Sequence, residues 1–348
     1  MTWLPLLLGD ASPSLRLLVL KELLHKDVDD KEIKELIRQQ QKDPLITALL
    51  AIQQKDGSWS TSESLGLLLD SPIRNTSLAM IRLGYLGLQN DHPAIQKAAE
   101  YLFTHQFDDG AWPRQPGRVL HFIHPTHGPA ITPKQTADPL FALAISGFAE
   151  DSRAEKAYEW LIEHRAEDGS WPTIFSPDGK IGYQPVGYRQ LPNSRFGCRT
   201  NSTSALNAFA YHPKRRNTDV PKRVLDLLLS RETKDRNYLG FEVARIIGIE
   251  PAHGFLTFHG RYDLALILNL CWRIGATTED PRVANMVKYL QEVQGTYGLW
   301  DYIPNPQATR WVTFDILRSL SHLDESGDWI STEPRTKYKS YPRAPRRF

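Results

Sequence analysis

The sequence predicts an all-α protein, an α/α toroid in which about five to six helix hairpins place a ring of inner helices inside outer helices. Three observations carry this prediction: a tryptophan motif that recurs along the chain, an amphipathic helical pattern before each copy, and a more apolar helical pattern after it. The alternating pattern typical of strands does not persist anywhere.

The recurring motif is a short turn sequence that ends in tryptophan. It reads Gln-Gln-Lys-Asp-Gly-Ser-Trp at 53–59, and related copies end at Trp112, Trp171 and Trp300. Trp112 follows Trp59 by 53 residues, Trp171 follows after 59 more, and Trp300 after another 129. The last gap is about two periods, so one unit has lost its motif. A period of this size indicates stacked supersecondary units.

Each motif separates an outer helix from an inner helix. Residues 94–105 form an amphipathic pattern of the outer type. Asp-Gly supplies the turn, with glycine at the positive φ that ends a helix, and the tryptophan then covers the turn with a large apolar face. We expect the inner helices at residues 76–86, 136–148, 203–211, 261–273 and 311–323.

The expected organisation has three parts: an N-terminal helical segment at 1–42, the toroid at 43–325 and a basic C-terminal tail at 326–348. The apolar run at the start is short, lacks a basic flank and meets Asp10, so we expect no signal peptide. No run reaches the roughly 18 apolar residues of a membrane span. The tail is expected to be solvated, and peripheral contact with an anionic membrane is the alternative.

Composition limits the classes of partner and the cellular setting that we expect. The net charge of +2 over 348 residues gives no reason to expect nucleic acid. Two cysteines are too few for a disulfide framework, which favours a reducing, cytoplasmic setting. Oligomeric state is left open.

The motif at 53–59 resembles the Gln-Trp repeat of squalene–hopene cyclases and related terpene cyclases. The likeness continues at 106–112, 165–171 and 294–300, so it covers about residues 43–323. Residues 308–313 also resemble the last inner helix of a group of uncharacterised bacterial cyclase-like proteins. The resemblance implies the toroid fold. Similar toroids serve cyclases, prenyltransferases and binding proteins, so it leaves the function open.

Class II terpene cyclases use an Asp-x-Asp-Asp motif as proton donor, and Asp27-Val28-Asp29-Asp30 matches it by letter. We reject this match as catalytic. In the family the motif lies late in the chain, whereas here it precedes the first Gln-Trp motif and runs into Lys31-Glu32-Ile33-Lys34. That context indicates an acidic N-cap opening a surface helix, which offers no desolvated pocket for a proton donor.

A better set of acids follows from overlaying the inner helices by their apolar pattern. The overlay puts Ser77, Asp138, Ser204, Asp263 and Asp315 in one register, near the helix starts. Acids that converge there raise one another's pKa, and we therefore predict Asp263, Asp315 and Asp138 as catalytic. The alternative is that aspartate simply favours a first turn, and pairing with Arg74, Arg199, Arg261 or Arg310 would lower these pKa values.

The ligand that the resemblance implies is an apolar isoprenoid-type molecule. Aromatic faces stabilise cations, as carbocation cyclisation requires. The candidate ligand-binding residues near inner helices and long loops are Tyr262, Trp311, Phe122, Phe196, Tyr85 and His121; Trp112 is a further aromatic of this kind.

No cofactor is expected. Prenyltransferases of this fold bind zinc through Asp, Cys and His, and the nearest analogues here are Cys198, His259 and Asp263. Their spacing is not a closed metal signature and the paired Asp-x-Cys pattern is missing, so zinc is only a weak alternative. Cys271 lies within an apolar helical pattern and is predicted to be a core thiol.

These observations predict a terpenoid cyclase-like protein that acts on an isoprenoid-type ligand in an aromatic-lined central cavity, without a credible class II acid motif. Two alternatives stay open: a non-catalytic toroid that binds an apolar ligand or a partner protein, and a zinc-dependent prenyltransferase-like enzyme. An acid in an enclosed apolar cavity would favour the enzyme, and a cavity plugged by side chains would favour the non-catalytic toroid.

The N-cap interpretation of residues 27–30 leads to a direct test. Replacing Asp29 and Asp30 together by Asn keeps the size and capping ability of both side chains. The midpoint of urea denaturation should therefore stay unchanged, and so should any turnover of an isoprenoid substrate. Activity lost in this double variant alone would overturn the placement of the active site.

Overall fold

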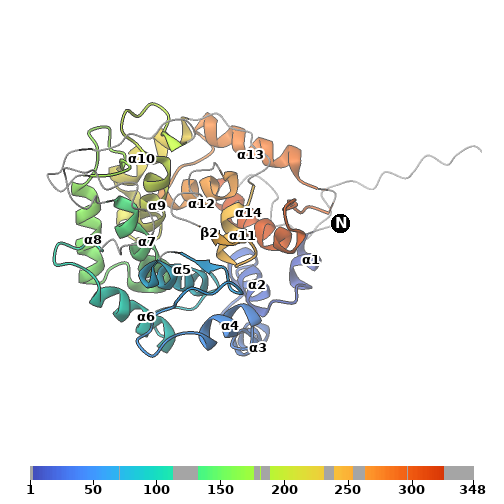
Figure 1. Cartoon of the computed structure of the whole chain (residues 1–348). Coiled ribbons are helices and arrows are strands. Elements are labelled where there is room, and N and C mark those ends of the chain that lie inside the picture. Colours follow the sequence, from blue (N-terminus) through green and yellow to red (C-terminus); the bar gives the residue numbers. More distant parts are fainter. Residues whose placement is uncertain are drawn as a thin grey trace, which may run out of the picture.

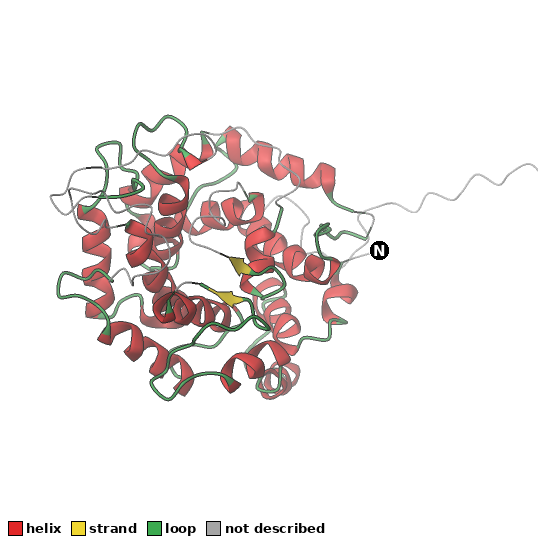
Figure 2. Ribbon diagram, in the orientation of Figure 1, coloured by secondary structure: helices red, strands yellow, loops and turns green. Residues whose placement is uncertain are grey.

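The helices form two concentric rings, with the inner helices surrounded by the outer ones (Figures 1 and 2). This computed structural model describes residues 3–69, 71–112, 132–175, 181, 189–230, 239–253, 263–295 and 297–324. Within them the predicted toroid is confirmed, and strand is confined to two short segments. No helix in this part of the chain has the length and apolar character needed to cross a membrane.

The two rings divide the helices as follows. The inner ring consists of α2 (Pro13–Leu18) continued by the π-helix η1 (Val19–Leu23), α5 (Pro72–Tyr85), α7 (Pro133–Leu143), α9 (Arg199–Ala210), α12 (Leu264–Ile274) and α14 (Thr309–Leu323). The outer ring consists of α3 (Lys31–Gln40), α4 (Pro44–Ala51), α6 (Pro93–Thr104), α8 (Ser152–Glu163), α10 (Asp219–Leu229) and α13 (Pro281–Val293). Short α1 (Leu4–Leu8) and π-helical η3 (Ala144–Phe148) complete these layers, and 3-10 turns lie at Arg215–Asn217 and Pro306–Ala308.

The first inner element lies beside the last. The π-helix η1 packs against α14, and α1 also contacts α14. Trp3, Leu7 and Leu15 belong to the same hydrophobic core as the rest of the ring. The N-terminal helices are therefore part of the toroid's packing.

The tryptophan motifs join each outer helix to its inner helix. The indole N–H donates to the carbonyl oxygen ten residues earlier, at the end of the outer helix. These pairs are Trp59 with Leu49 (2.8 Å), Trp112 with Leu102 (2.7 Å), Trp171 with Leu161 (2.8 Å) and Trp300 with Leu290 (2.9 Å). All four side chains are at most 3% exposed, which confirms the predicted burial. The hydrogen bond satisfies a buried indole and a helix-end carbonyl together.

The motif's glutamine joins neighbouring units. Gln53 Nε2 donates to the carbonyl of Gly57 within its own turn and to the carbonyl of Ala94 at the start of the next outer helix, α6 (3.0 and 2.9 Å). Gln106 repeats this pattern one unit later. The turns approach the neighbouring helix so closely that a Cβ on Gly57, where φ is +91°, would lie 2.3 Å from the carbonyl oxygen of Lys97. Glycine is required there on both grounds.

The same motifs define the register of the inner helices and correct the predicted overlay. The backbone N–H of each motif tryptophan donates to a hydroxyl on the inner helix, at Thr76, Thr136, Ser202 and Thr313. Two residues after these positions come Leu78, Asp138, Ser204 and Asp315. The overlay was therefore right for Asp138, Ser204 and Asp315, and wrong by one residue for Ser77.

Asp263 also departs from the overlay, because it precedes α12 as its N-cap instead of lying within the helix. The physical reason is that α5 and α9 are buried on nearly every side. Their apolar residues therefore do not mark one face, and an overlay of apolar positions cannot fix the register of these helices. Four of the five predicted starts of the inner helices were late, and the start predicted at residue 261 was early, because α12 begins at Leu264. Ser71-Pro72 and Thr132-Pro133 begin α5 and α7 with an N-cap and an N1 proline.

One unit lacks the tryptophan motif and fills the ring's centre instead. Between α10 and α12 the chain forms α11 (Phe241–Ile246), which contacts α5, α12 and α14 (Figure 1). The strand β2 (Ala252–His253) then pairs in parallel with β1 (Leu67–Leu68) from the loop before α5. The lost motif therefore coincides with a helix inserted among the inner helices.

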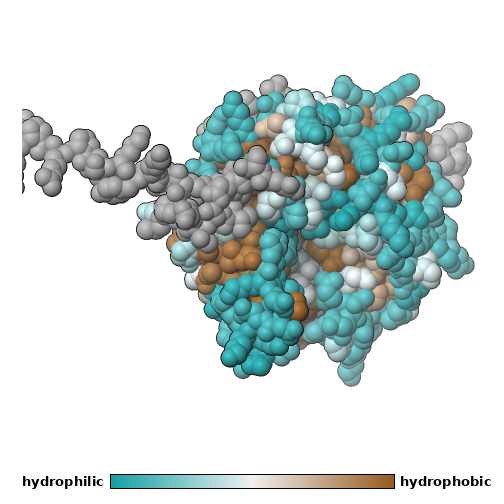
Figure 3. Space-filling view, turned by 180° about the vertical axis from the view of Figure 1, so that it is seen from behind, coloured by the Kyte–Doolittle hydropathy of each residue, from teal (hydrophilic) through white to brown (hydrophobic). Residues whose placement is uncertain are grey.

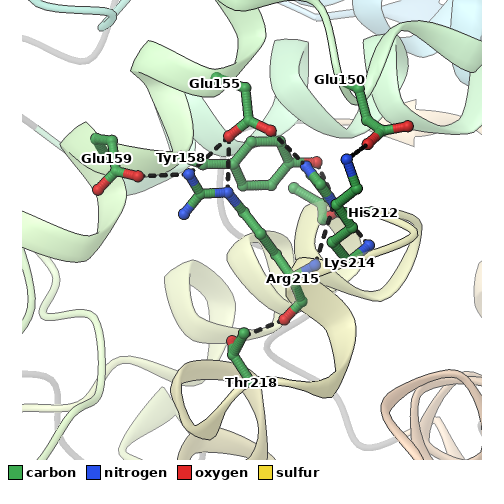
Figure 4. Close-up of polar contacts among 9 residues, drawn as sticks. Glu150, Glu155, Tyr158, Glu159, His212, Lys214, Arg215 and Thr218 are labelled. Atoms are coloured by element: carbon green, nitrogen blue, oxygen red, sulfur yellow. Dashed lines mark hydrogen bonds and ion pairs between the residues drawn. The ribbon is translucent and has the colours of Figure 1, made fainter.

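A polar cluster ties the outer helix α8 to the turn after α9 (Figure 4). The buried His212 accepts the backbone N–H groups of Lys214 and Arg215 at Nδ1, both at 3.1 Å. Its Nε2 therefore carries the proton and lies 2.9 Å from Glu155 Oε1. Arg215 bridges Glu155 and Glu159 beside it. The polar groups of this cluster bind one another, so the cluster holds the outer helix α8 to the turn after α9.

We predict that the buried tryptophans hold the ring together. Replacing Trp59, Trp112 or Trp171 by Ala should lower the free energy of unfolding by roughly 3–5 kcal/mol, because each substitution opens a cavity beside a helix end. Urea denaturation measures this. Phe107, which is 55% exposed, provides the control, and Phe107→Ala should leave the midpoint nearly unchanged. Equal midpoints for all four variants would show that the motif is dispensable.

Candidate functional site

The inner ring encloses a small cavity under α11. Its volume is about 30 Å³, which is room for roughly two water molecules. It is lined by Tyr85, Phe141, Asn207, Tyr211, Glu242, Val243, Ile246, Leu266, Asn269 and Asp315. Nine of these residues lie on α5, α7, α9, α11, α12 and α14, and Tyr211 directly follows α9. The space-filling view from behind shows apolar patches on a largely polar face that is hollowed near its middle (Figure 3).

Asp315 is the predicted acid that lies on this cavity. Its side chain is 3% exposed, and its Oδ1 accepts a hydrogen bond from the Tyr85 hydroxyl at 3.4 Å. Arg318, one helical turn later, forms an ion pair with the same carboxylate. Burial raises the pKa of Asp315, and the Arg318 charge offsets part of that rise. The structure thus brings together two predicted residues, Asp315 and Tyr85, on one cavity wall.

Arginines and aromatic rings surround this acid. The guanidinium of Arg318 lies over the rings of Phe314 and Tyr85, at 5.1 and 5.5 Å from their centroids, and also pairs with Glu22 of η1 (3.1 Å). Arg273 lies 3.9 Å from the centroid of Tyr211. Burial raises the pKa of Tyr85 well above its ordinary value, so its hydroxyl stays protonated. The cavity wall therefore combines cation-binding rings with charges that are already paired.

The carboxylate of Asp263 is bound by backbone N–H groups. Its two carboxylate oxygens accept three backbone N–H groups, from Gly240 (2.8 Å), Glu242 (2.7 Å) and Ala265 (3.1 Å). The side chain thereby caps α12 and also anchors the start of α11. Burial raises the pKa of Asp263 to about 7, against the lowering effect of these hydrogen bonds. The geometry favours an anchoring role for this residue over direct chemistry.

Asp138 belongs to a separate polar group. Lys134 Nζ lies 2.6 Å from Asp138 Oδ1 and 2.9 Å from Ser204 Oγ, and Ser204 donates to the same carboxylate at 3.0 Å. Desolvation lowers the pKa of the buried Lys134, while the Asp138 charge opposes this. Asp138 is not among the residues that line the cavity, so the structure does not bring the three predicted acids into one site.

The predicted aromatic set is only partly gathered. Trp311 is buried against Tyr85 with ring centroids 6.1 Å apart, behind the cavity wall. Phe196 is half-buried beside Arg195, and Trp112 serves in its motif. Tyr262, Phe122 and His121 lie outside the described residues. Of the predicted arginine partners, Arg310 pairs with Asp10 at 3.1 Å, and Arg261 also lies outside the described residues.

The structure describes two of the three weak zinc candidates. Cys198 is buried in front of α9, Asp263 is occupied by backbone N–H groups, and His259 lies outside the described residues. In the part of the chain that the structure describes, no group of three or more His, Cys, Asp or Glu side chains is arranged to hold a metal ion. Cys271 is a buried core thiol whose pKa is raised by desolvation, as its apolar sequence context predicted.

Sequence reasoning missed most of the cavity wall. Asn207, Asn269, Glu242, Phe141 and Tyr211 were not proposed. One signal was available for Arg318: it follows Asp315 by three residues and so shares its helix face. No comparable signal marks α11, because six residues are too short for a helical period to show.

Comparison with known proteins agrees with this architecture. Residues 28–180 match the squalene–hopene cyclase C-terminal domain. The squalene–hopene cyclase of Zymomonas mobilis is 31% identical over 133 residues, which cover 38% of this chain and 19% of that enzyme. The chain is similar to squalene–hopene cyclases over this part of its length. It spans about a fifth of the length of that curated relative.

Two solved structures are similar over most of the chain. One is the type II terpene cyclase MstE from Scytonema in complex with geranylgeranyl dihydroxybenzoate, with 17% identity, a TM-score of 0.46 and coverage of 82% of this chain and 73% of that one. The other is a protein from Actinoplanes, with 14% identity, a TM-score of 0.43 and 89% coverage of both chains.

Asp263 predicts a specific pH dependence of stability. Its folded pKa of about 7 exceeds the ordinary aspartate value of 3.8, so the fold favours the protonated form. Its contribution is therefore complete below about pH 4 and is lost as the pH rises towards 7. Urea denaturation between pH 4.5 and 7.5 should show a shallower decline for Asp263→Asn than for the wild type. The control is Asp91→Asn, at an exposed position, which should follow the wild-type slope. If Asp263→Asn also follows the wild-type slope, Asp263 is charged over this whole pH range and the prediction is wrong.

Proposed function

We propose that this cyclase relative binds one end of an isoprenoid-type molecule in the central cavity and that Asp315 is the acid that acts on it. The observation that carries the proposal is a buried carboxyl group on a cavity wall that also contains the rings of Tyr85, Phe141 and Tyr211. The relationship to squalene–hopene cyclases over residues 28–180 supports the ligand class.

The chemistry is acid-initiated addition to a carbon–carbon double bond. Protonated Asp315 gives its proton to one alkene carbon, a C–H bond forms from the π electrons, and the neighbouring carbon becomes a cation. A second double bond then attacks this cation and closes a ring. Loss of a proton from the final cation to the Asp315 carboxylate completes the cycle, so the product is an isomer of the substrate. Burial favours the protonated acid, and the aromatic faces favour the cation.

The cavity is small because α11 occupies the centre of the ring. About 30 Å³ cannot hold an isoprenoid chain, and Val243 and Ile246 of α11 form part of the wall. Turnover therefore requires α11 to shift. Its anchors, the Asp263 carboxylate and the hydrogen bond from Arg82 of α5 to the carbonyl of Arg245, are the contacts that would have to rearrange.

The same observation supports a second candidate function. A helix packed against α5, α12 and α14 fills the ring, as a non-catalytic toroid would permit. In that case α11 stays in place, and the ring serves as a scaffold that binds a ligand without converting it.

Turnover by a widened variant distinguishes the two functions. Val243→Ala with Ile246→Ala removes two side chains from the cavity wall, and squalene and farnesol serve as probes. Under the cyclase proposal, gas chromatography with mass spectrometry should detect a cyclic isomer of a probe. Adding Asp315→Asn should reduce this product at least about 100-fold, because a general acid is lost.

The control is Asp226→Asn on the outer helix α10, where the side chain is 62% exposed, and its turnover should equal that of the widened variant. Calorimetric binding without any conversion would favour the non-catalytic toroid. If the wild type and the widened variant bind neither probe, the proposed ligand class is wrong.

A further inference from the structure

Asn207 is the residue on the cavity wall whose bonding is incomplete. Its side chain is 3% exposed, and its amide nitrogen has no hydrogen-bond partner among the described residues. A buried amide of this kind favours a partner that accepts a hydrogen bond. A bound ligand group with an acceptor atom would be such a partner.

A second amide donor lies on the same wall. The side-chain oxygen of Asn269 accepts a hydrogen bond from Arg273 Nε at 2.9 Å, so its amide nitrogen remains the group to offer a ligand. Asn207 is on α9 and Asn269 on α12, and both line the cavity.

Three carboxylate oxygens on this wall already accept hydrogen bonds. Both carboxylate oxygens of Glu242 accept from Arg245, and Asp315 Oδ1 accepts from Arg318 and Tyr85. The amides of Asn207 and Asn269 are then the donors on this wall that a ligand oxygen can use. The small volume matches the end of a ligand and not its whole chain.

We infer that the cavity takes an end of its ligand that bears a hydroxyl or carbonyl oxygen, and that Asn207 is the residue that selects this end over a hydrocarbon end. The inference rests on the proposed function, because it names the chemistry of the ligand end that enters the same cavity. It treats Asn207 as a specificity residue and assigns it no step in the reaction.

Matched probes test the selection. Farnesol carries a terminal hydroxyl, and β-farnesene is a hydrocarbon of the same chain length. Dissociation constants are measured by calorimetry for the full chain with Val243→Ala and Ile246→Ala, and for that protein with Asn207→Leu added. Leucine has the same number of side-chain non-hydrogen atoms as asparagine and no donor. We expect farnesol to bind at least about tenfold more tightly than β-farnesene, and Asn207→Leu to weaken farnesol about tenfold while leaving β-farnesene unchanged.

Stability provides the readout that a merely structural asparagine would not give. Because Asn207→Leu removes an unsatisfied buried amide, its urea midpoint should equal or exceed that of the parent. Asn285→Leu, at an exposed position on α13, should change neither binding nor midpoint.

Two results would overturn the inference. Equal binding of the two probes in the parent, or farnesol binding that Asn207→Leu does not weaken, means that Asn207 makes no selection. A lower midpoint with both probes weakened alike means that Asn207 only supports the fold. If the parent binds neither probe, the proposed function fails as well, so that result is distinct from a failure of Asn207 alone.

Discussion

The hydrogen bond from the indole of each motif tryptophan to the carbonyl ten residues earlier is the interaction on which the ring depends. It closes the turn where an outer helix gives way to an inner one, and the backbone N–H of the same tryptophan holds the inner helix by a hydroxyl. In the first two motifs the glutamine also ties the turn to the next outer helix. Because each unit contacts mainly its neighbours, these repeated local bonds add up to the curvature of the whole.

The unit without the motif differs most from the repeat. Asp263 takes over as an anchor there, accepting N–H groups from the starts of α11 and α12, and α11 enters the centre of the ring. This departure creates the cavity wall that carries Glu242, Val243 and Ile246. Breaks in a repeat of this kind concentrate at functional sites, since the regular units already supply the stability.

The centre of the ring is more polar than a site for a pure hydrocarbon would require. Asp315 with Arg318, Glu242 with Arg245 and Lys134 with Asp138 are ion pairs with at most a small exposed fraction. Buried pairs contribute little net stability because desolvation offsets their attraction. Each pair lies within one helix, and with these charges matched, the amide of Asn207 is the buried group on this wall that a ligand can complete.

The sequence alone predicts the toroid, the buried tryptophans, the N-cap at Asp30 and the presence of Asp315 and Tyr85 near the centre. These features arise from local patterns: a repeated turn, a capping residue and a helix face. Tertiary packing is needed to establish the register of Asp263, the insertion of α11 and the placement of Asn207 and Asn269 on one cavity wall. Helices buried on all sides show no phase in their apolar pattern, a six-residue helix shows no period, and contacts between residues far apart in the chain arise only once the ring has formed.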